Sequence, residues 1–129
     1  MEACMRNLLI LLSVMLMLAA ALPLYAACES GDCKNGEGTY VWPNGMKYTG
    51  QYKNGKMDGF GTFTWPSGDT YTGQWKNNMK EGEGTYIYHT GDRYDGEWKH
   101  DKKNGKGTVT LPNGTKFTGQ WRDGELVGN

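Results

Sequence analysis

The sequence lacks an excess of charge of either sign. Lys plus Arg and Asp plus Glu both total 14 among 129 residues, so the formal net charge is 0. A protein that binds the phosphate backbone of nucleic acids needs a basic surface, and this chain has no basic excess from which to build one. We therefore expect no nucleic-acid partner.

Residues that usually carry enzyme chemistry are also scarce. The two histidines, His89 and His100, have no Cys, Asp or His neighbours at metal-ligand spacing, so no metal site is predicted. Residues 50–56 come within one residue of a phosphate-binding loop. However, Met57 stands where Ser or Thr would bind magnesium, and no helix pattern follows. The sequence therefore predicts a protein that is not an enzyme and holds no cofactor.

Long apolar runs are absent except at the start of the chain. Residues 8–22 are apolar apart from Ser13, follow Arg6, and lead into small residues. This pattern is typical of a secretory signal peptide, which we expect to be helical and to span residues 1–27. An uncleaved membrane anchor is the alternative, although Pro23 and the short apolar core favour cleavage. The mature protein is thus predicted to be exported, either periplasmic or secreted.

Cysteine is rare, with three in the chain. Cys4 lies in the predicted leader, which leaves Cys28 and Cys33 in a short N-terminal linker, residues 28–35. An even pair in an oxidising compartment indicates a disulfide. Residues 25–28, Tyr-Ala-Ala-Cys, also resemble a bacterial lipoprotein processing site, in which lipidated Cys28 would anchor the protein to a membrane. The two alternatives exclude each other because Cys28 has one sulfur.

Glycine is abundant and regularly placed. The motif Gly-x-Gly-Thr recurs every 23 residues, and the spacing never slips. Such a period indicates one supersecondary unit that is copied and becomes stable by stacking on its copies. The four predicted repeats are residues 36–58, 59–81, 82–104 and 105–129. We expect the function to reside in a repeated surface.

Each repeat has the pattern of a β-hairpin. In the first, extended runs over residues 38–42 and 46–52 flank Pro43-Asn44-Gly45, which suits a type I turn followed by a left-handed glycine. This pairing places Tyr40 opposite Tyr48. No amphipathic helix of useful length follows the leader to cover the sheet. The prediction is an all-β, single-layered stack of four antiparallel hairpins with eight main strands.

Strand alternation separates an aromatic face from a polar one. Tyr, Trp and Phe gather on one face, and Thr, Gln and charged residues occupy the other. Glycine pairs such as Gly38 opposite Gly50 leave gaps in which rings can lie over bare backbone. The aromatic face is the predicted binding groove, with these candidate residues: Trp42, Tyr48, Trp65, Tyr71, Tyr88 and Tyr94.

The third repeat resembles a known family. Gly82-Glu83-Gly84-Thr85-Tyr86 with Gly91-Asp92-Arg93-Tyr94-Asp95-Gly96-Glu97-Trp98 is similar to the MORN (membrane occupation and recognition nexus) repeat. The resemblance extends from Gly36 to about Gly128. It implies a curved stack of β-hairpins with an aromatic groove, acting as a non-catalytic interaction or lipid-associated module. Val109 and Leu111 depart from the aromatic pattern in the last repeat.

These observations lead to two functional hypotheses. The first is a binding or scaffolding module of the cell envelope or secreted space that holds a protein partner in the aromatic groove. The alternative is a membrane-peripheral protein that associates with lipid through Cys28 or exposed rings. The balance of acidic and basic residues favours the protein partner, because a lipid surface attracts clustered Lys and Arg.

Overall fold

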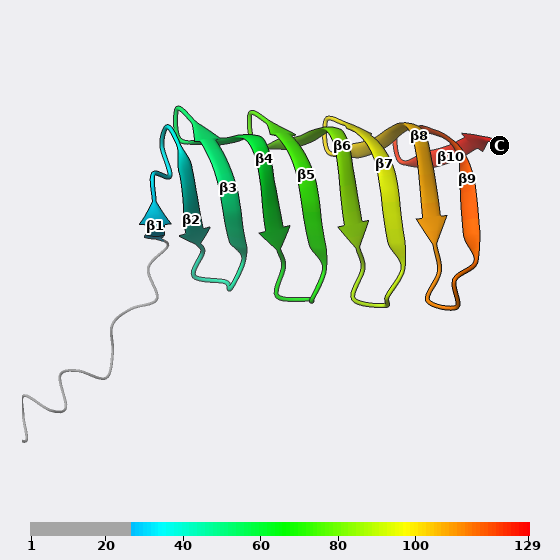
Figure 1. Cartoon of the computed structure of the whole chain (residues 1–129), viewed down its shortest axis with the longest axis horizontal. Coiled ribbons are helices and arrows are strands. Elements are labelled where there is room, and N and C mark those ends of the chain that lie inside the picture. Colours follow the sequence, from blue (N-terminus) through cyan, green and yellow to red (C-terminus); the bar gives the residue numbers. More distant parts are fainter. Residues whose placement is uncertain (1–26) are drawn as a thin grey trace, which may run out of the picture.

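The computed structural model describes residues 27–129, which form one open antiparallel sheet of ten strands arranged in chain order (Figure 1). The strands are β1 (Ala27–Gly31), β2 (Glu37–Val41), β3 (Lys47–Lys53), β4 (Lys56–Thr64), β5 (Thr70–Lys76), β6 (Met79–Ile87), β7 (Arg93–Lys99), β8 (Lys102–Thr110), β9 (Lys116–Arg122) and β10 (Glu125–Gly128). The all-β, single-layered prediction is confirmed. The predicted signal peptide lies outside the described residues, except for Ala27.

The four predicted hairpins are β2–β3, β4–β5, β6–β7 and β8–β9. Gly38 pairs with Gly50 and Tyr40 with Tyr48, as predicted, and each later hairpin repeats this register. Consecutive hairpins pair in the same manner, so that Gly50 also lies opposite Gly61. The glycine positions therefore form a continuous line across the sheet.

Two kinds of turn alternate along the sheet. Within the first hairpin, the Gly45 N–H donates to the Trp42 carbonyl at 2.9 Å, and Gly45 has φ 85°, which confirms the predicted turn. Between hairpins, Asn54 and Gly55 have φ 50° and 74°, the signs that a two-residue type I′ turn requires. Residues 50–56 are thus the end of a strand and a turn, not a phosphate-binding loop.

The sheet has ten strands where eight were predicted, because an edge strand lies at each end. β1 pairs with β2, and β10 pairs with β9. The prediction that residues 28–35 form a linker needs correction, since β1 occupies the first part of this segment. Every residue of β1 and β10 is exposed. Such strands show no alternation of apolar and polar residues that a sequence pattern could reveal.

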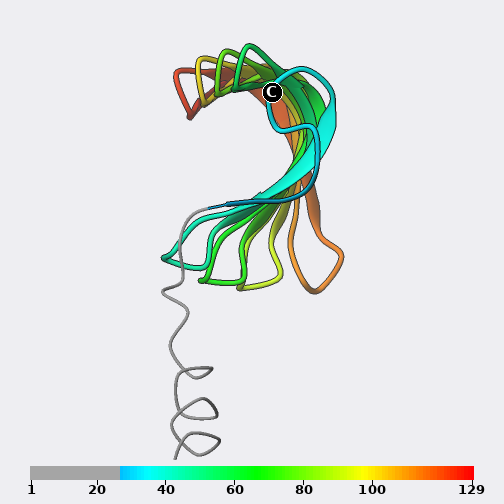
Figure 2. The same ribbon diagram turned by 90° about the vertical axis from the view of Figure 1, so that its left-hand side faces the viewer.

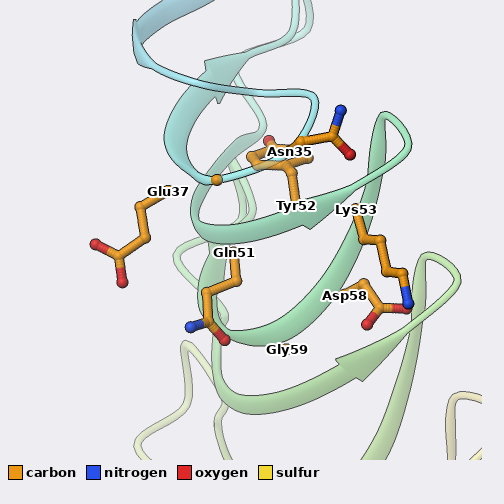
Figure 3. Close-up of a pocket in the computed structure, with 8 residues that line it drawn as sticks. Asn35, Glu37, Gln51, Tyr52, Lys53, Asp58 and Gly59 are labelled. Atoms are coloured by element: carbon orange, nitrogen blue, oxygen red, sulfur yellow. The ribbon is translucent and has the colours of Figure 1, made fainter.

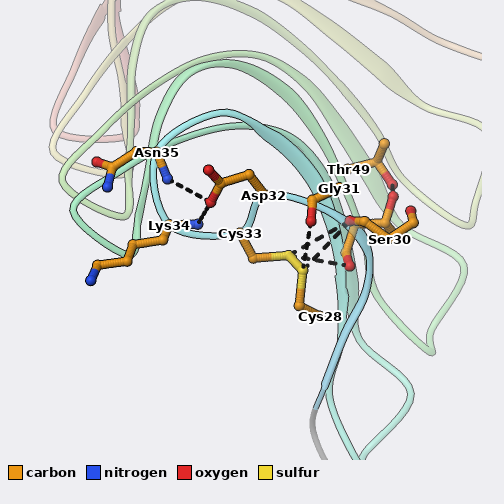
Figure 4. The surroundings of a disulfide bond; sticks show 9 residues. Cys28, Ser30, Gly31, Asp32, Cys33, Lys34, Asn35 and Thr49 are labelled. Carbon is orange, nitrogen blue, oxygen red and sulfur yellow. Dashed lines mark hydrogen bonds between the residues drawn. A yellow bond between two sulfur atoms is a disulfide. The ribbon is translucent and has the colours of Figure 1, made fainter.

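The disulfide between Cys28 and Cys33 closes the turn between β1 and β2 (Figure 4). Asp32 organises the same turn, because Oδ1 accepts hydrogen bonds from the Lys34 and Asn35 amides at 2.8 and 2.9 Å. These backbone bonds lower the pKa of the Asp32 carboxyl. In this structure the Cys28 sulfur is engaged in the disulfide, the form that excludes lipidation.

The sheet curls into an open trough when viewed along the stack (Figure 2). A single layer can bury side chains only by curving around them, so the buried rings lie on the concave face. Bulges between Gly50 and Tyr52, and at the equivalent places in β5 and β7, contribute to the bend. Gln51 Oε1 accepts the Phe60 N–H beside the first bulge at 2.7 Å. Gln74 and Glu97 do the same in the next two repeats.

The opposite, convex face is polar, as predicted. Cross-strand hydroxyl pairs run along it, with Thr62 and Thr72 oxygens 2.9 Å apart. At the equivalent place in the third repeat, Thr85 donates to Asp95 at 2.6 Å. The Arg93 guanidinium also binds Asp95 and lowers the pKa of this carboxyl. These partners make Asp95 part of a structural network on the convex face.

Candidate functional site

Three tyrosines anchor the concave face. Tyr48, Tyr71 and Tyr94 are completely buried, and their hydroxyls donate to the carbonyls of the residues three positions ahead at 2.9 to 3.1 Å. The Tyr71 ring lies directly over Gly84 of the following hairpin, where any Cβ would collide with it. Tyr48 and Tyr94 cover Gly61 and Gly107 in the same way. Each of these tyrosines thus packs its ring onto the backbone of the next hairpin and joins neighbouring repeats.

These tyrosines belong to a continuous ladder of rings that we call the core row. Neighbouring centroids are 5.1 to 5.5 Å apart and the planes meet at 82° to 90°, which is the favourable edge-to-face arrangement. The Trp75 and Trp98 indoles each donate to a glycine carbonyl of the preceding strand at 3.2 Å. The members of the core row, in spatial order, are Tyr52, Tyr48, Trp75, Tyr71, Trp98, Tyr94 and Trp121.

A second ladder, which we call the stacked row, runs beside the core row. Its neighbouring centroids are 4.5 to 5.4 Å apart with tilted planes. All of its rings except buried Phe63 are half-buried and reach solvent. The stacked row consists of Tyr40, Trp42, Phe63, Trp65, Tyr86 and Tyr88. It ends in the last repeat, where Val109 and Leu111 replace the rings.

The six predicted binding residues therefore divide into two groups. Trp42, Trp65 and Tyr88 lie in the stacked row and are accessible to a partner. The buried Tyr48, Tyr71 and Tyr94 cannot contact a partner, so their assignment as binding residues needs correction. The physical reason is the glycine of the next strand beneath each ring, which leaves room for the ring to lie against the backbone.

Two lysines that the sequence analysis missed extend over the rings. The Lys80 Nζ lies 4.7 Å from the Trp98 ring centroid and 5.2 Å from that of Tyr86. The Lys103 Nζ lies 4.7 Å from the Trp121 centroid and, at slightly greater distances, close to two tyrosines. These distances are within the range of cation–π attraction. Lys80 also lies within 5.7 Å of the Trp65 and Tyr71 centroids.

Burial lowers the pKa of the Lys80 ammonium, and the nearby Asp101 partly opposes this shift. Met57 holds the equivalent position 23 residues before Lys80 and is buried. Met57, Lys80 and Lys103 occupy the same position in successive repeats, just after the turn between two hairpins. This shared position was the sequence feature that could have placed both lysines beside the rings, because the strand after each such turn begins there. The groove is consequently aromatic with two embedded positive charges.

Asp69 connects the turns of the second and third hairpins. Its carboxylate accepts hydrogen bonds from the Tyr86 hydroxyl at 2.9 Å and from the His89 amide at 2.8 Å, and it pairs with His89 Nδ1 at 2.8 Å. The bonds to His89 and Tyr86 lower the pKa of Asp69. Asp69 therefore holds Tyr86 of the stacked row in place. Among residues 27–129, no group of His, Cys, Asp and Glu side chains could hold a metal ion.

A pocket of about 450 Å³ lies at the edge of the first repeat (Figure 3). Its lining includes Glu37, Gln51 and Asp58. A similar pocket recurs beside Gln74 one repeat further on. Such pockets follow from the bulge in each repeat, so they do not single out a chemical site.

In the part of the chain described by the structure, no helix is long and apolar enough to cross a membrane.

Comparison with known proteins gives a family and a structural neighbour. The family model of the MORN repeat matches residues 34–47, 48–70, 71–93, 94–116 and 117–129. These matches follow the same 23-residue period as the predicted repeats. They begin at Tyr48, Tyr71 and Tyr94, whereas the predicted repeats begin at glycines. No curated protein matches the chain.

One structural neighbour is the TCP domain of SAS-4 from Drosophila melanogaster, which was solved in complex with a proline-rich motif of Ana2. It is similar to this chain with a TM-score of 0.51 and 16% sequence identity. The similarity covers 78% of this chain and 56% of that chain, so little more than half of the neighbour is represented here. At this identity the likeness concerns the fold.

Proposed function

This chain belongs to the MORN repeat family, and we propose that it is a non-catalytic module that binds an extended segment of a partner protein in its concave groove. The observation that carries the proposal is the stacked row. It presents half-buried rings across three consecutive repeats, and no element within residues 27–129 covers them. Aromatic surfaces of this kind are characteristic of interaction sites.

Two further observations support a protein partner. The core row and the glycine contacts make the groove a rigid surface, so binding would require little ordering of the module itself. In addition, the structural neighbour was solved with a peptide motif from another protein. We also propose that the interaction takes place outside the cytoplasm, because the first 27 residues have the pattern of a secretory signal peptide.

The first test replaces Trp42 and Trp65 together with alanine. Both rings reach solvent and pack through Phe63, so we expect their loss to weaken peptide binding by at least about 2 kcal/mol, roughly 30-fold in Kd. The measurement is selection of a displayed library of random peptides by the mature protein, followed by titration of the enriched peptides. Circular dichroism and thermal melting verify that the variant remains folded.

The matched control variant replaces Thr64 and Thr72 on the convex face with alanine. This variant is expected to bind the peptides as tightly as the unchanged protein does. Enrichment that survives the tryptophan replacements, or that is lost with the threonine replacements, would place binding on another surface. Sedimentation with lipid vesicles is measured in parallel. If the two tryptophans were required for vesicle binding and for no peptide, the lipid alternative would replace the protein-binding proposal.

A further inference from the structure

We propose that the groove selects an acidic partner segment in the polyproline II conformation, whose carboxylates pair with Lys80 and Lys103 while its prolines pack against the stacked row. This inference rests on the proposed function and specifies the chemistry of the partner. It is carried by the position of the two ammonium groups, their lack of anionic partners, and their spacing.

Neither ammonium group has a carboxylate within ion-pair distance among the described residues, although the Asp101 charge acts on Lys80 from further away. The ion pairs within residues 27–129 join His89 to Asp69 and Arg93 to Asp95, and they leave both groove lysines without a carboxylate. The aromatic faces attract each ammonium but accept none of its hydrogen bonds in the way that an anion does. A carboxylate entering the groove would therefore gain a charge-assisted hydrogen bond in partly desolvated surroundings.

Two acidic side chains close to Lys80 are already engaged by the turns. Asp101 Oδ1 accepts the Lys80 amide at 2.8 Å, and a Glu81 carboxylate oxygen accepts the His100 amide at 3.0 Å. Their charges remain, but these contacts hold them at the edge of the sheet. The anion that completes the site is thus expected from a partner.

The spacing of the lysines selects the partner's backbone conformation. Lys80 and Lys103 occupy equivalent places on β6 and β8, which lie two strands apart, so the positions are separated by about 9.6 Å. A polyproline II helix has three residues per turn and rises about 3.1 Å per residue, which gives about 9.3 Å per turn. Acidic residues at every third position would therefore face successive lysines.

A peptide in the β conformation does not satisfy the same spacing. Three residues also span about 10 Å in a strand, but side chains at positions i and i+3 then point to opposite faces. Polyproline II segments also dock into aromatic grooves at low entropic cost, because their backbone is already extended. The rings of Trp65, Tyr86 and Tyr88 lie beside the lysines and provide the apolar surface for the prolines.

The test uses three fluorescent synthetic peptides: (Glu-Pro-Pro)5, (Gln-Pro-Pro)5 and (Lys-Pro-Pro)5. Anisotropy titration of the mature protein at low ionic strength is expected to show that the glutamate peptide binds about tenfold more tightly than the glutamine peptide. The lysine peptide is expected to bind most weakly. The preference for glutamate is expected to diminish as salt is added, because it arises from charge pairing.

The critical variant combines Lys80→Met and Lys103→Met. Methionine already occupies the equivalent position at Met57, where it is buried against the same kind of ring surface, so the variant is expected to fold. It is expected to bind the glutamate and glutamine peptides equally. The matched control, Lys76→Met with Lys99→Met, removes the same charge from exposed positions and is expected to retain the preference.

The outcomes separate this inference from the proposed function. If all three peptides bind equally and only the Trp42 and Trp65 replacements abolish binding, the groove binds peptides but the acidic preference is wrong. If none of these peptides binds while the random library still yields peptides that depend on those tryptophans, the inference fails and the proposed function stands. If the library also yields no tryptophan-dependent peptide, both proposals fail. Lysine-dependent binding to phosphatidylserine vesicles without binding to the glutamate peptide would also overturn the inference and indicate an anionic membrane surface.

Discussion

Gly73→Val is expected to destabilise the protein by about 3 kcal/mol, at the upper end of the range for overpacked sites. A Cβ on Gly73 would lie 2.5 Å from the Gly84 Cα and 2.6 Å from the Glu83 carbonyl oxygen. Both atoms belong to the backbone of the adjacent strand, so no rotamer change can relieve the collision. The strands must separate, and the Tyr71 ring that bridges them must move.

Thermal melting followed by circular dichroism measures this effect. For a domain of about 100 residues, a loss of about 3 kcal/mol corresponds to a decrease in Tm of about 12 to 24 °C. Gly128→Val is the matched control, because a Cβ at Gly128 meets no atom within 4 Å. Equal melting temperatures for the two variants would show that the glycine line does not lie at a close contact between strands.

The glycine line is also the part of the fold that the sequence predicts best. A period of 23 residues, with glycine and aromatic residues at constant offsets, leaves little freedom in pairing, since a one-residue slip would turn every ring to the polar face. Gly45 and its equivalents identify the turns within the hairpins. Together these features predict the register within each of the four hairpins, from β2–β3 to β8–β9, which the structure confirms.

The edge strands and the depth of each ring were not predictable in the same way. β1 and β10 are held by backbone hydrogen bonds and carry no buried side chain, so their residues show no pattern. The alternation of side chains along the strands placed Trp65 and Tyr71 on the same face, but it could not predict that Trp65 reaches solvent while Tyr71 is buried. That difference depends on Gly84, which lies across the boundary between two repeats and receives the Tyr71 ring.

The positions of Lys80 and Lys103 in the groove could not be predicted from the alternation of residues along a strand. Sequence patterns assign lysine to solvent because its charge is costly to bury, yet a lysine can lay its apolar stem along a hydrophobic surface. Lys80 does so, with its ammonium over the Trp98 and Tyr86 rings. The outcome depends on ring positions in two neighbouring hairpins, which a single repeat does not reveal. The charge of the groove therefore emerges only from the assembled stack.

The second large effect is cooperative unfolding at alkaline pH. Burial raises the pKa of Tyr52 and of Tyr94 to about 12, and it also raises the pKa values of Tyr48, Tyr71 and Tyr86. In the unfolded chain these phenols titrate near pH 10. Above that pH the unfolded state releases protons that the folded state retains, so stability is full below about pH 10 and is lost as pH rises towards 12.

The expected slope is steep because several tyrosines act together. Each contributes a loss of about 1.4 kcal/mol per pH unit, whereas the total stability of a small domain is about 5 to 15 kcal/mol. Lys80 acts in the opposite direction, since its pKa is lowered in the fold, but it is one group against five. We therefore expect tyrosinate absorbance and loss of the circular dichroism signal to rise together in one transition between about pH 10 and 12.

Tyr94→Phe isolates the contribution of one hydroxyl. The variant keeps the ring over Gly107 but loses the hydrogen bond to the Glu97 carbonyl, so a cost of about 1 kcal/mol is expected at neutral pH. The slope of unfolding free energy against pH, measured by urea titration between about pH 10 and 11.5, is expected to become shallower by about 1.4 kcal/mol per unit. An unchanged slope would mean that Tyr94 is not protected from ionisation by its burial in the folded state.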